Sequence, residues 1–520
     1  MVRTEKHRMR LWIVILFVTA NSHCAFAGDW PQFGGSDEHN IVSSERGLPD
    51  TFDLGKKTAG GEDPDPATMQ NVRWVAKLGT MTSSSPVVAG GRIIIGSSDC
   101  DALRAGDAKH RYNGLILCFD AATGKRLWRL IVPWRKDLMM SDDLNIGVAS
   151  SATFDGNRAY IVSNRGEVLC LDVDGLRNGN DGPVKDEAEY QSGDSNFTPA
   201  GGDDSGDIVW RYDMLTELKV RPHISCNSCV QVHGDLLYIA TCNAADAEGK
   251  KAHSELSPAL VVLDKKTGAL VATDDESIST VLNHGQYSSP TFVRVNGADQ
   301  LIYAAGDGFC YGFDATPALL PGHTLKTLQK LWWYDCNPPE YRSKDGKPIP
   351  YTSGVGPSEI VGTPVFYKNR IYLGLGQDWT HAGSNGCFSC IDVTKRGDIS
   401  DSGKIWENKA VARTNGTAAI ADGLVYIADQ FGVLYCLDAE TGQTVWTHRI
   451  KGNVCSSPLV ADGKIYIGSR DGGEFFVLAA GRERKVLATI PLRSPVHATA
   501  VAANGVLYIA TNTHLYAISK

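Results

Sequence analysis

The stretch Leu424–Trp446, LVYIADQFGVLYCLDAETGQTVW, decides the fold. It contains two apolar runs, Val425–Ala428 and Val433–Leu437. Both runs are rich in β-branched and aromatic residues, so we expect them to form strands. Gly432 marks the turn between them, and Asp438-Ala-Glu-Thr-Gly442 marks a second turn before a third strand. A small antiparallel sheet of this kind cannot bury its own faces, so the stretch requires copies of itself.

Copies of this stretch recur along the chain. Most copies end a strand with a turn aspartate and carry a tryptophan downstream, and two copies, Gly473–Gly481 and His514–Ser519, are degenerate. The most compact copies recur about every 40–50 residues, which is the period of four-stranded propeller blades. The turn aspartates are Asp120, Asp172, Asp264, Asp314, Asp392 and Asp438.

A second signature precedes each copy and sets the number of blades. It is a short segment of small residues, rich in Ser and Thr, that predicts an innermost strand and is followed by a hairpin with glycine in its turn. Eight such segments occur, and they begin at Ser84, Ser150, Asn227, Ser288, Gly362, Asn415, Cys455 and His497.

The outer strand of the last unit comes from the other end of the chain. The eighth unit stops at Lys520 after three strands, and Asn71–Leu78 (NVRWVAKL) has the pattern of the missing one. Pairing the two ends would remove an exposed sheet edge. The sequence therefore predicts an all-β fold, an eight-bladed propeller of four-stranded antiparallel blades over residues 71–520, with the ring closed by an N-terminal strand.

The repeat D-x-x-T-G-x-x-x-W, together with the opening Asp29-Trp-Pro-Gln-Phe33, resembles the PQQ-like β-propeller repeat family of secreted bacterial type. That family includes the quinoprotein alcohol dehydrogenases and the non-enzymatic outer-membrane assembly factor BamB. The resemblance covers nearly the whole mature chain and implies the fold. It does not choose between the functions, because a fold and the site it carries are separable.

The N-terminal residues predict export. Met1–Ala27 has a basic start, a short apolar run and an Ala25-Phe-Ala27 cleavage motif, the pattern of a signal peptide. We expect a periplasmic or extracellular protein with no transmembrane segment after cleavage, in which residues 28–70 form an extension that packs on the ring. Cleavage removes four basic residues and one acidic residue, which changes the formal net charge from −8 to −11. This acidic excess disfavours nucleic acid as a partner.

The repeated tryptophans are interpreted as structural. Their periodic place on outer strands resembles that of the residues that dock neighbouring blades in this family. The third and seventh blades have Ala272 and Ala488 near this place, and we expect those blades to be the softest. The expected docking residues are Trp74, Trp128, Trp210, Trp333 (or its neighbour Trp332), Trp406 and Trp446.

Long insertions are predicted to crowd one mouth of the ring, where loops held by a rigid scaffold commonly carry function. Trp379 could stack on a planar ligand there, with Asp378 and His381 beside it. Three further histidines occur where the chain enters blades at this face: His223, His284 and His497. The alternative is that the tryptophan packs against its own loop and the histidines form structural hydrogen bonds. No catalytic residue and no metal site is predicted.

Two functions from different classes remain. The first is an exported, non-catalytic binding or scaffold module that engages an envelope protein or polymer through the loop-rich mouth. The second is a PQQ- and Ca²⁺-dependent dehydrogenase for alcohols or aldehydes, which needs an aromatic face, cations and Asp, Glu or Asn oxygens for the metal. The resemblance implies two adjacent cysteines above the cofactor. The chain has no Cys-Cys pair, which favours the first function, whereas the long loops favour the second. A third reading is a protein that binds a small ligand without converting it.

Overall fold

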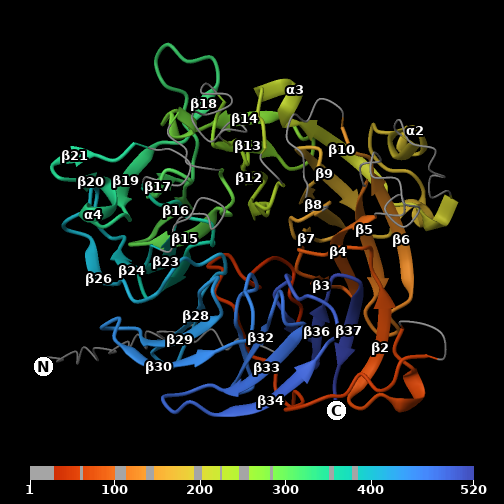
Figure 1. Ribbon diagram of the computed structural model, residues 1–520. Helices are drawn as coiled ribbons and strands as arrows, with labels where there is room; N and C mark the ends of the chain where they lie inside the picture. The colour runs from red at the N-terminus through yellow and green to blue at the C-terminus, as the bar shows by residue number, and fades with distance from the viewer. Residues whose placement is uncertain are drawn as a thin grey trace, which may run out of the picture.

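Eight antiparallel sheets surround a central axis as the blades of a propeller (Figure 1). The computed structural model describes residues 28–58, 63–99, 113–135, 146–192, 202–222, 225–244, 257–280, 285–350, 357–376 and 385–520. The predicted all-β, eight-bladed architecture is confirmed. The expected signal peptide, residues 1–27, lies outside the described residues.

Each blade has four main strands, and two blades gain a short fifth strand at the outer edge. From the axis outward, blade 1 has β3 (Val87–Ala89), β4 (Arg92–Asp99), β5 (Asn113–Asp120) and β6 (Arg126–Val132); blade 2 has β7 (Thr153–Asp155), β8 (Arg158–Val162), β9 (Glu167–Asp172) and β10 (Asp207–Asp213); blade 3 has β11 (Gln231–His233), β12 (Leu236–Ala240), β13 (Leu260–Asp264), β14 (Leu270–Thr273) and β18 (Lys326–Thr327); blade 4 has β15 (Thr291–Val295), β16 (Ala298–Ala304), β17 (Phe309–Asp314), β19 (Lys330–Asp335) and β25 (Gly397–Asp398).

The second half of the ring follows the same plan. Blade 5 has β22 (Val365–Tyr367), β23 (Arg370–Gly376), β24 (Gly386–Asp392) and β26 (Lys404–Asn408); blade 6 has β27 (Ala419–Ala421), β28 (Leu424–Ala428), β29 (Val433–Asp438) and β30 (Thr444–Arg449); blade 7 has β31 (Leu459–Ala461), β32 (Lys464–Gly468), β33 (Glu474–Ala479) and β34 (Val486–Pro491); blade 8 has β35 (Val501–Ala503), β36 (Val506–Ala510), β37 (His514–Ile518) and β2 (Val72–Lys77).

The remaining elements are short. They are the strands β1 (Val42–Ser43), β20 (Ser343–Lys344) and β21 (Lys347–Pro348), the helices α2 (Glu187–Ser192), α3 (Met214–Leu218) and α4 (Pro339–Arg342), and the 3₁₀ turns η1 (Pro66–Thr68), η2 (Gly175–Asn178), η3 (Gly202–Asp204) and η4 (Ile278–Thr280). Among the described residues, no helix combines the length and the apolar character needed to cross a membrane.

Strand β28 shows why the strand sequences are apolar without interruption. Successive side chains of a strand point to opposite faces. Val425 and Ile427 join the apolar cluster shared with blade 5, whereas Tyr426 and Ala428 join the cluster shared with blade 7. Both faces of the blade are therefore buried against neighbours, and the hydrophobic core consists of layers between blades.

The ring closes as the sequence predicts. β2 pairs antiparallel with β37 at the C-terminal end of the chain, so that Trp74 lies opposite Ala517 (Figure 1). The eighth blade is thereby assembled from the two ends of the chain.

Neighbouring blades are joined near the rim by tryptophans of the outer strands. In five cases the indole N–H donates to a carbonyl oxygen in the turn between the third and fourth strands of the next blade. These bonds, 2.9–3.1 Å long, run from Trp74 to Ala121, Trp128 to Val173, Trp210 to Lys265, Trp406 to Ala439 and Trp446 to Gly481.

Blade 4 departs from this pattern. The strand register places Trp332, not Trp333, at the position equivalent to the docking tryptophans. Its indole donates to Gln300 Oε1 of the same blade at 3.0 Å. Trp333 points to the other face, as the alternation of a strand requires, and the Lys330 ammonium lies 4.6 Å from the centre of one of its rings.

Residues 28–46, which we call the strap, run across one end of the axis before the first blade begins. The strap forms hydrogen bonds with the innermost strand of every blade. The contact falls at the equivalent residue of each blade, except that in the third blade it lies one residue earlier. The bonds join Trp30 to Val88, Pro31 to Phe154, Asp37 to both Gln231 and Phe292, Glu38 to Phe366, Asn40 to Ile420, Ile41 to Val460 and Ser43 to Ala502. The strap therefore closes the axis on the face of the first-to-second-strand hairpins.

The contact between Gly442 and Trp406 yields a stability prediction. Gly442 has φ +71°, and a Cβ placed on it would lie 2.4 Å from the Trp406 ring. Gly423 of the same blade has φ +75° with open space around it. We expect Gly423→Ala to lower the unfolding free energy by about 1–2 kcal/mol through backbone strain alone, and Gly442→Ala to lower it by a further ~1–3 kcal/mol through overpacking.

Urea unfolding of the two variants and the parent protein measures both effects. Gly423→Ala is the matched control, because it has the same strain without the clash. Equal losses in the two variants would show that the indole does not pack on this turn.

Candidate functional site

A cavity of about 270 Å³ lies on the axis, above the strap. Phe33 of the strap lines it from one end, and the inner strands form its wall. Gln430 and Arg470 reach it from the turns between the second and third strands of blades 6 and 7. The strap therefore closes one end of the cavity, and the other end faces the turns between the second and third strands.

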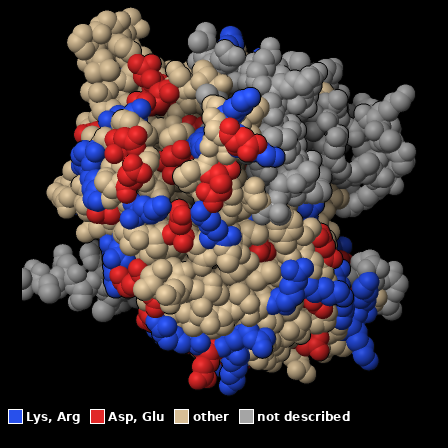
Figure 2. Space-filling model, turned by 60° about the vertical axis from the view of Figure 1, so that its left-hand side comes forward, with Lys and Arg blue, Asp and Glu red and all other residues tan. Residues whose placement is uncertain are grey.

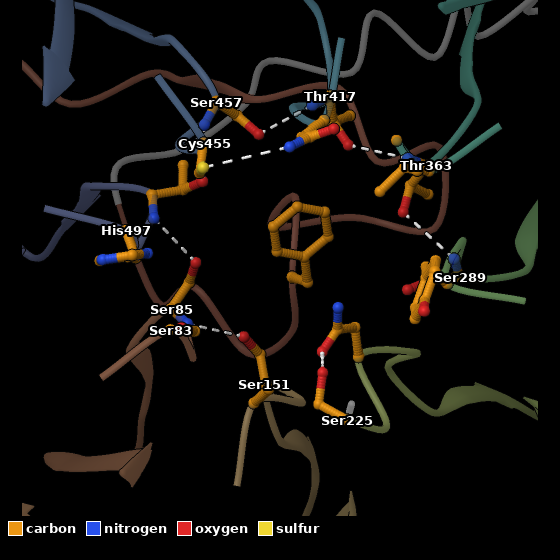
Figure 3. Close-up of a pocket in the computed structure, with 18 of the residues that line it drawn as sticks. Ser83, Ser85, Ser151, Ser225, Ser289, Thr363, Thr417, Cys455, Ser457 and His497 are labelled. Carbon is orange, nitrogen blue, oxygen red and sulfur yellow. Dashed lines mark hydrogen bonds between the residues drawn. The ribbon is translucent and has the colours of Figure 1, made fainter. Parts of the chain in front are cut away.

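A ring of hydrogen bonds holds the inner strands together at the level of the cavity (Figure 3). In seven of the eight steps a backbone N–H donates to the side-chain hydroxyl of a Ser or Thr in the adjacent blade, over 2.9–3.3 Å. The ring residues are Ser85, Ser151, Cys229, Ser289, Thr363, Thr417, Ser457 and Thr499, and all are buried. Each comes from one of the eight inner-strand signatures.

Cys229 is the one ring residue without a hydroxyl. Burial raises the pKa of its thiol, and hydrogen bonding from the Ser151 backbone opposes that rise. The Ser151 amide thus points to the Cys229 sulfur as the other amides point to hydroxyls. Cys229 N–H in turn donates to Ser289 at 2.9 Å. The cysteine continues the ring with a weaker acceptor.

A second layer lines the cavity two residues before each ring position. Every blade contributes one side chain to this layer, from the segment that leads into its innermost strand. The layer consists of Ser83, Ala149, Asn227, Tyr287, Val361, Asn415, Cys455 and His497. The ring is nearly uniform, whereas this layer differs from blade to blade.

Polar groups gather on the side of the second layer formed by blades 6, 7 and 8. Asn415 Nδ2 lies 4.0 Å from Cys455 Sγ. Asn415 Oδ1 and Gln430 Oε1 are buried acceptors that have no hydrogen-bond partner among the described residues. Buried polar atoms of this kind call for a partner, which a bound ligand or water could supply.

Two guanidinium groups line the cavity in different electrostatic settings. Arg413 is buried, and its Nη2 lies 3.7 Å from the equally buried Glu359 carboxylate, so its charge is compensated inside the protein. Arg470 is partly buried, and its nearest carboxylate is that of the exposed Asp471, 3.6 Å away. A solvent-exposed pair is weak, so Arg470 supplies most of the positive charge that the cavity presents.

The Cys455 thiol and the His497 imidazole of the second layer are both uncharged at neutral pH. Burial raises the pKa of Cys455, although Arg470 and Asn415 oppose the rise. Burial, reinforced by the charge of Arg470, lowers the pKa of His497 to about 4. A nucleophilic cysteine needs the opposite shifts, a depressed thiol pKa beside a protonated base. This arrangement can donate and accept hydrogen bonds, and it does not activate Cys455.

Comparison with known proteins agrees with the repeat and the fold. A family model described as outer membrane protein assembly factor BamB matches residues 67–174 and 393–518. This match covers less than half of the chain, and it agrees with the resemblance to the PQQ-like β-propeller family. Two curated relatives carry the name outer membrane protein assembly factor BamB. That of Alteromonas naphthalenivorans is 33% identical over 64 residues, 12% of this chain, and that of Salmonella typhimurium is 33% identical over 58 residues, 11% of this chain. Each match spans 15% of the relative's length.

Solved propellers are similar to the whole ring at low sequence identity. BamB from Moraxella catarrhalis is 12% identical, with 86% of this chain and 97% of that chain covered and a TM-score of 0.48. Quinohemoprotein alcohol dehydrogenase from Comamonas testosteroni is 13% identical, with 95% and 81% covered and a TM-score of 0.46. A shared fold does not fix the function, so the site is judged from its own residues.

One of the six candidate binding residues lies in the cavity. His497 belongs to the second layer. The other five, His223, His284, Asp378, Trp379 and His381, lie outside the described residues. Within the described parts of the chain, no group of three or more His, Cys, Asp or Glu side chains could hold a metal ion.

Sequence reasoning missed the rest of the cavity lining, although a signal for it was present. All eight inner-strand signatures were found, and the residue two positions before each ring residue faces the same channel. Arg470 gave no such signal, because it lies in a turn outside the signature.

The lowered pKa of His497 predicts a pH dependence of stability. The unfolded chain binds a proton near the ordinary pKa of about 6.5, but the folded protein binds it only near pH 4. Stability is therefore lost as the pH falls from 6.5 to 4, by up to about 3 kcal/mol. We expect His497→Gln to lack this part of the acid sensitivity.

Urea unfolding of both proteins at several pH values between 7 and 4 measures the difference. The stability of the parent protein should fall relative to that of the variant across this range. A difference in unfolding free energy that stays constant with pH would contradict the prediction. It would mean that His497 binds a proton equally well in the folded and the unfolded protein.

Proposed function

We propose that this chain is a non-catalytic binding module of the cell envelope, which engages an envelope protein or polymer through the face toward which the cavity is directed. One observation carries the proposal. The described cavity lining offers hydrogen-bonding groups and positive charge, but both of its thiols, Cys229 and Cys455, have a raised pKa, and no carboxylate is among its members. A lining of this kind favours the binding of a partner over general acid–base or nucleophilic catalysis.

The family assignment supports the location and the class of partner. The matching family model and both curated relatives are described as outer membrane assembly factors. An envelope location accords with the export expected from residues 1–27. Outside the cavity, acidic and basic side chains are interleaved over the described part of the side shown in Figure 2, so its surface has no extended field of one sign. The exported protein is proposed to act in the periplasm or outside the cell.

Site-specific photocrosslinking tests the proposed face. A photoreactive residue replaces Lys451 or Asp471, which are exposed beside the cavity mouth. Matched controls replace Lys125 or Glu440, which are exposed in third-to-fourth-strand turns at the opposite face. We expect irradiated cells to yield adducts with an envelope component at the first two positions only, identified by mass spectrometry. Adducts only at the control positions, or none at all four, would contradict the proposal.

The alternative is a dehydrogenase that uses PQQ and Ca²⁺. Arg470 could face a carboxylate of PQQ, and Tyr287 could contact its ring system. The metal, however, requires several oxygen ligands, and oxidation of an alcohol requires a base. Among the described residues that line the cavity, none is Asp or Glu. These residues do not fit the cofactor and its metal, so no reaction step is assigned to them.

Calorimetric titration with PQQ, with and without Ca²⁺, distinguishes the two functions. We expect no binding heat and no increase in melting temperature under either condition. Calcium-dependent, one-to-one binding would overturn the non-catalytic assignment and would call for assays of alcohol and aldehyde oxidation.

A further inference from the structure

The cavity has two kinds of position, and only one is explained by the architecture. Every ring residue is used in bonds between blades, so a Ser, Thr or Cys there is a requirement of the fold. The second layer has no such shared task, and its eight residues include an aromatic, an imidazole, a thiol and two amides. Departure from the repeat at positions that face a cavity points to recognition of a ligand.

The polar part of the cavity is a continuous arc. Asn415, Cys455 and His497 occupy the second layer in three consecutive blades, 6 to 8. Gln430 and Arg470 extend the arc from the turns of blades 6 and 7. The arc therefore combines two amide oxygens that have no hydrogen-bond partner among the described residues, Asn415 Oδ1 and Gln430 Oε1, with one guanidinium whose carboxylate neighbour, Asp471, is exposed.

The opposite part of the cavity is mainly apolar except at blade 3, where Ser225 donates a hydrogen bond to Asn227 Oδ1 over 2.6 Å. Ala149 and Ile146 line it on the blade 2 side, and Tyr287 and Val361 line it in blades 4 and 5. Tyr287 is buried, with 8% of its surface exposed. Phe33 of the strap adds a second aromatic side chain at the closed end. A ligand that fills the cavity must present a charged or polar end to one arc and an apolar body to the other.

The net charge restricts the ligand further. The Arg413 charge is compensated by Glu359, and His497 is neutral near pH 7. Arg470 remains as a single cationic anchor. A guanidinium binds carboxylates through paired hydrogen bonds. One anchor suits a singly charged anion, and an apolar wall without carboxylates gives an organic cation no counter-charge.

We propose that the axial cavity binds a small organic monoanion, a carboxylate with an aryl or branched aliphatic body, with its carboxylate at Arg470 and its body against Tyr287, Val361 and Phe33. At ~30 Å³ for each water-sized group, the cavity holds roughly nine such groups. This inference goes beyond the binding of an envelope partner, because it concerns a small ligand on the axis.

Calorimetry with three probes of similar size tests the assignment: phenylacetate, phenylacetamide and phenethylamine. They share one aromatic body and differ in the charge of the polar end. We expect phenylacetate to bind one-to-one at neutral pH. The neutral probe should bind at least roughly tenfold more weakly because it cannot form an ion pair with the guanidinium, and the cationic probe because the guanidinium repels it. Acetate, which lacks the body, should also bind at least roughly tenfold more weakly, since it buries no apolar surface against the wall.

Two substitutions locate the site. Arg470→Gln removes the anchor and should weaken phenylacetate binding roughly tenfold or more. Arg482→Gln is the matched control, because Arg482 is an arginine of the same blade that lies 65% exposed on a rim turn and pairs with Asp438. It should leave the affinity unchanged. Melting temperatures of both variants establish that the ring is folded.

Several outcomes would overturn the proposal. These are equal affinities for phenylacetate and phenylacetamide, binding of acetate as tight as that of phenylacetate, equal effects of the two arginine substitutions, and no binding of any probe by the folded protein. The proposed envelope partner stands on the crosslinking experiment alone, so failure here and failure there are distinguishable.

Discussion

The hydrogen-bonded ring around the axis is the constraint on which the rest of the structure depends. A propeller brings eight inner strands together edge-on, so their backbone amides at this level have no partner within the same sheet. An unpaired buried N–H costs about 1–3 kcal/mol, and eight of them would be a serious loss for a protein of ordinary stability. One short side-chain acceptor per blade removes that loss and fixes the spacing between blades. The ring position is occupied by Ser or Thr in seven blades, and Cys229 is the one exception.

The rim uses a different interaction to the same end. There, at five of the eight interfaces, a large indole covers a turn of the next blade and donates one hydrogen bond to it, so these blades are held both near the axis and near the rim. Between these two contacts lie apolar faces of β-branched and aromatic residues. These faces pack by shape and tolerate substitutions that conserve side-chain volume. The fold therefore leaves only the second layer of the axis and the loops free to differ from blade to blade, and the candidate site occupies that part.

The periodic part of this structure could be predicted from the sequence, and the rest could not. The turn aspartates, the eight inner-strand signatures and the closing strand are repeated or locally encoded, and all appeared as expected. The choice between Trp332 and Trp333 depended on the strand register after the insertion 315–329, which pairs Gly312 with Trp332. In blade 3, expected to be soft for lack of a docking tryptophan, the outer edge is covered by β18, which pairs parallel with β14. Nothing in an irregular insertion announces such a two-residue strand. The convergence of Arg470 with His497 is likewise a product of the ring, since neighbouring blades meet at the axis.

The strap has a consequence for how the chain reaches this state. Its Ser43 bonds to Ala502, a separation of 459 residues, and it also bonds to each blade between. The segment nearest the start of the described chain can therefore complete its contacts only after the last blade exists. Contacts of such long range close slowly, and the strap remains without its partners until they close. The same geometry makes the assembled ring act as one unit. Losing any blade removes a strap contact as well as two blade interfaces. A ring that lacks a blade is therefore not expected to be a stable intermediate.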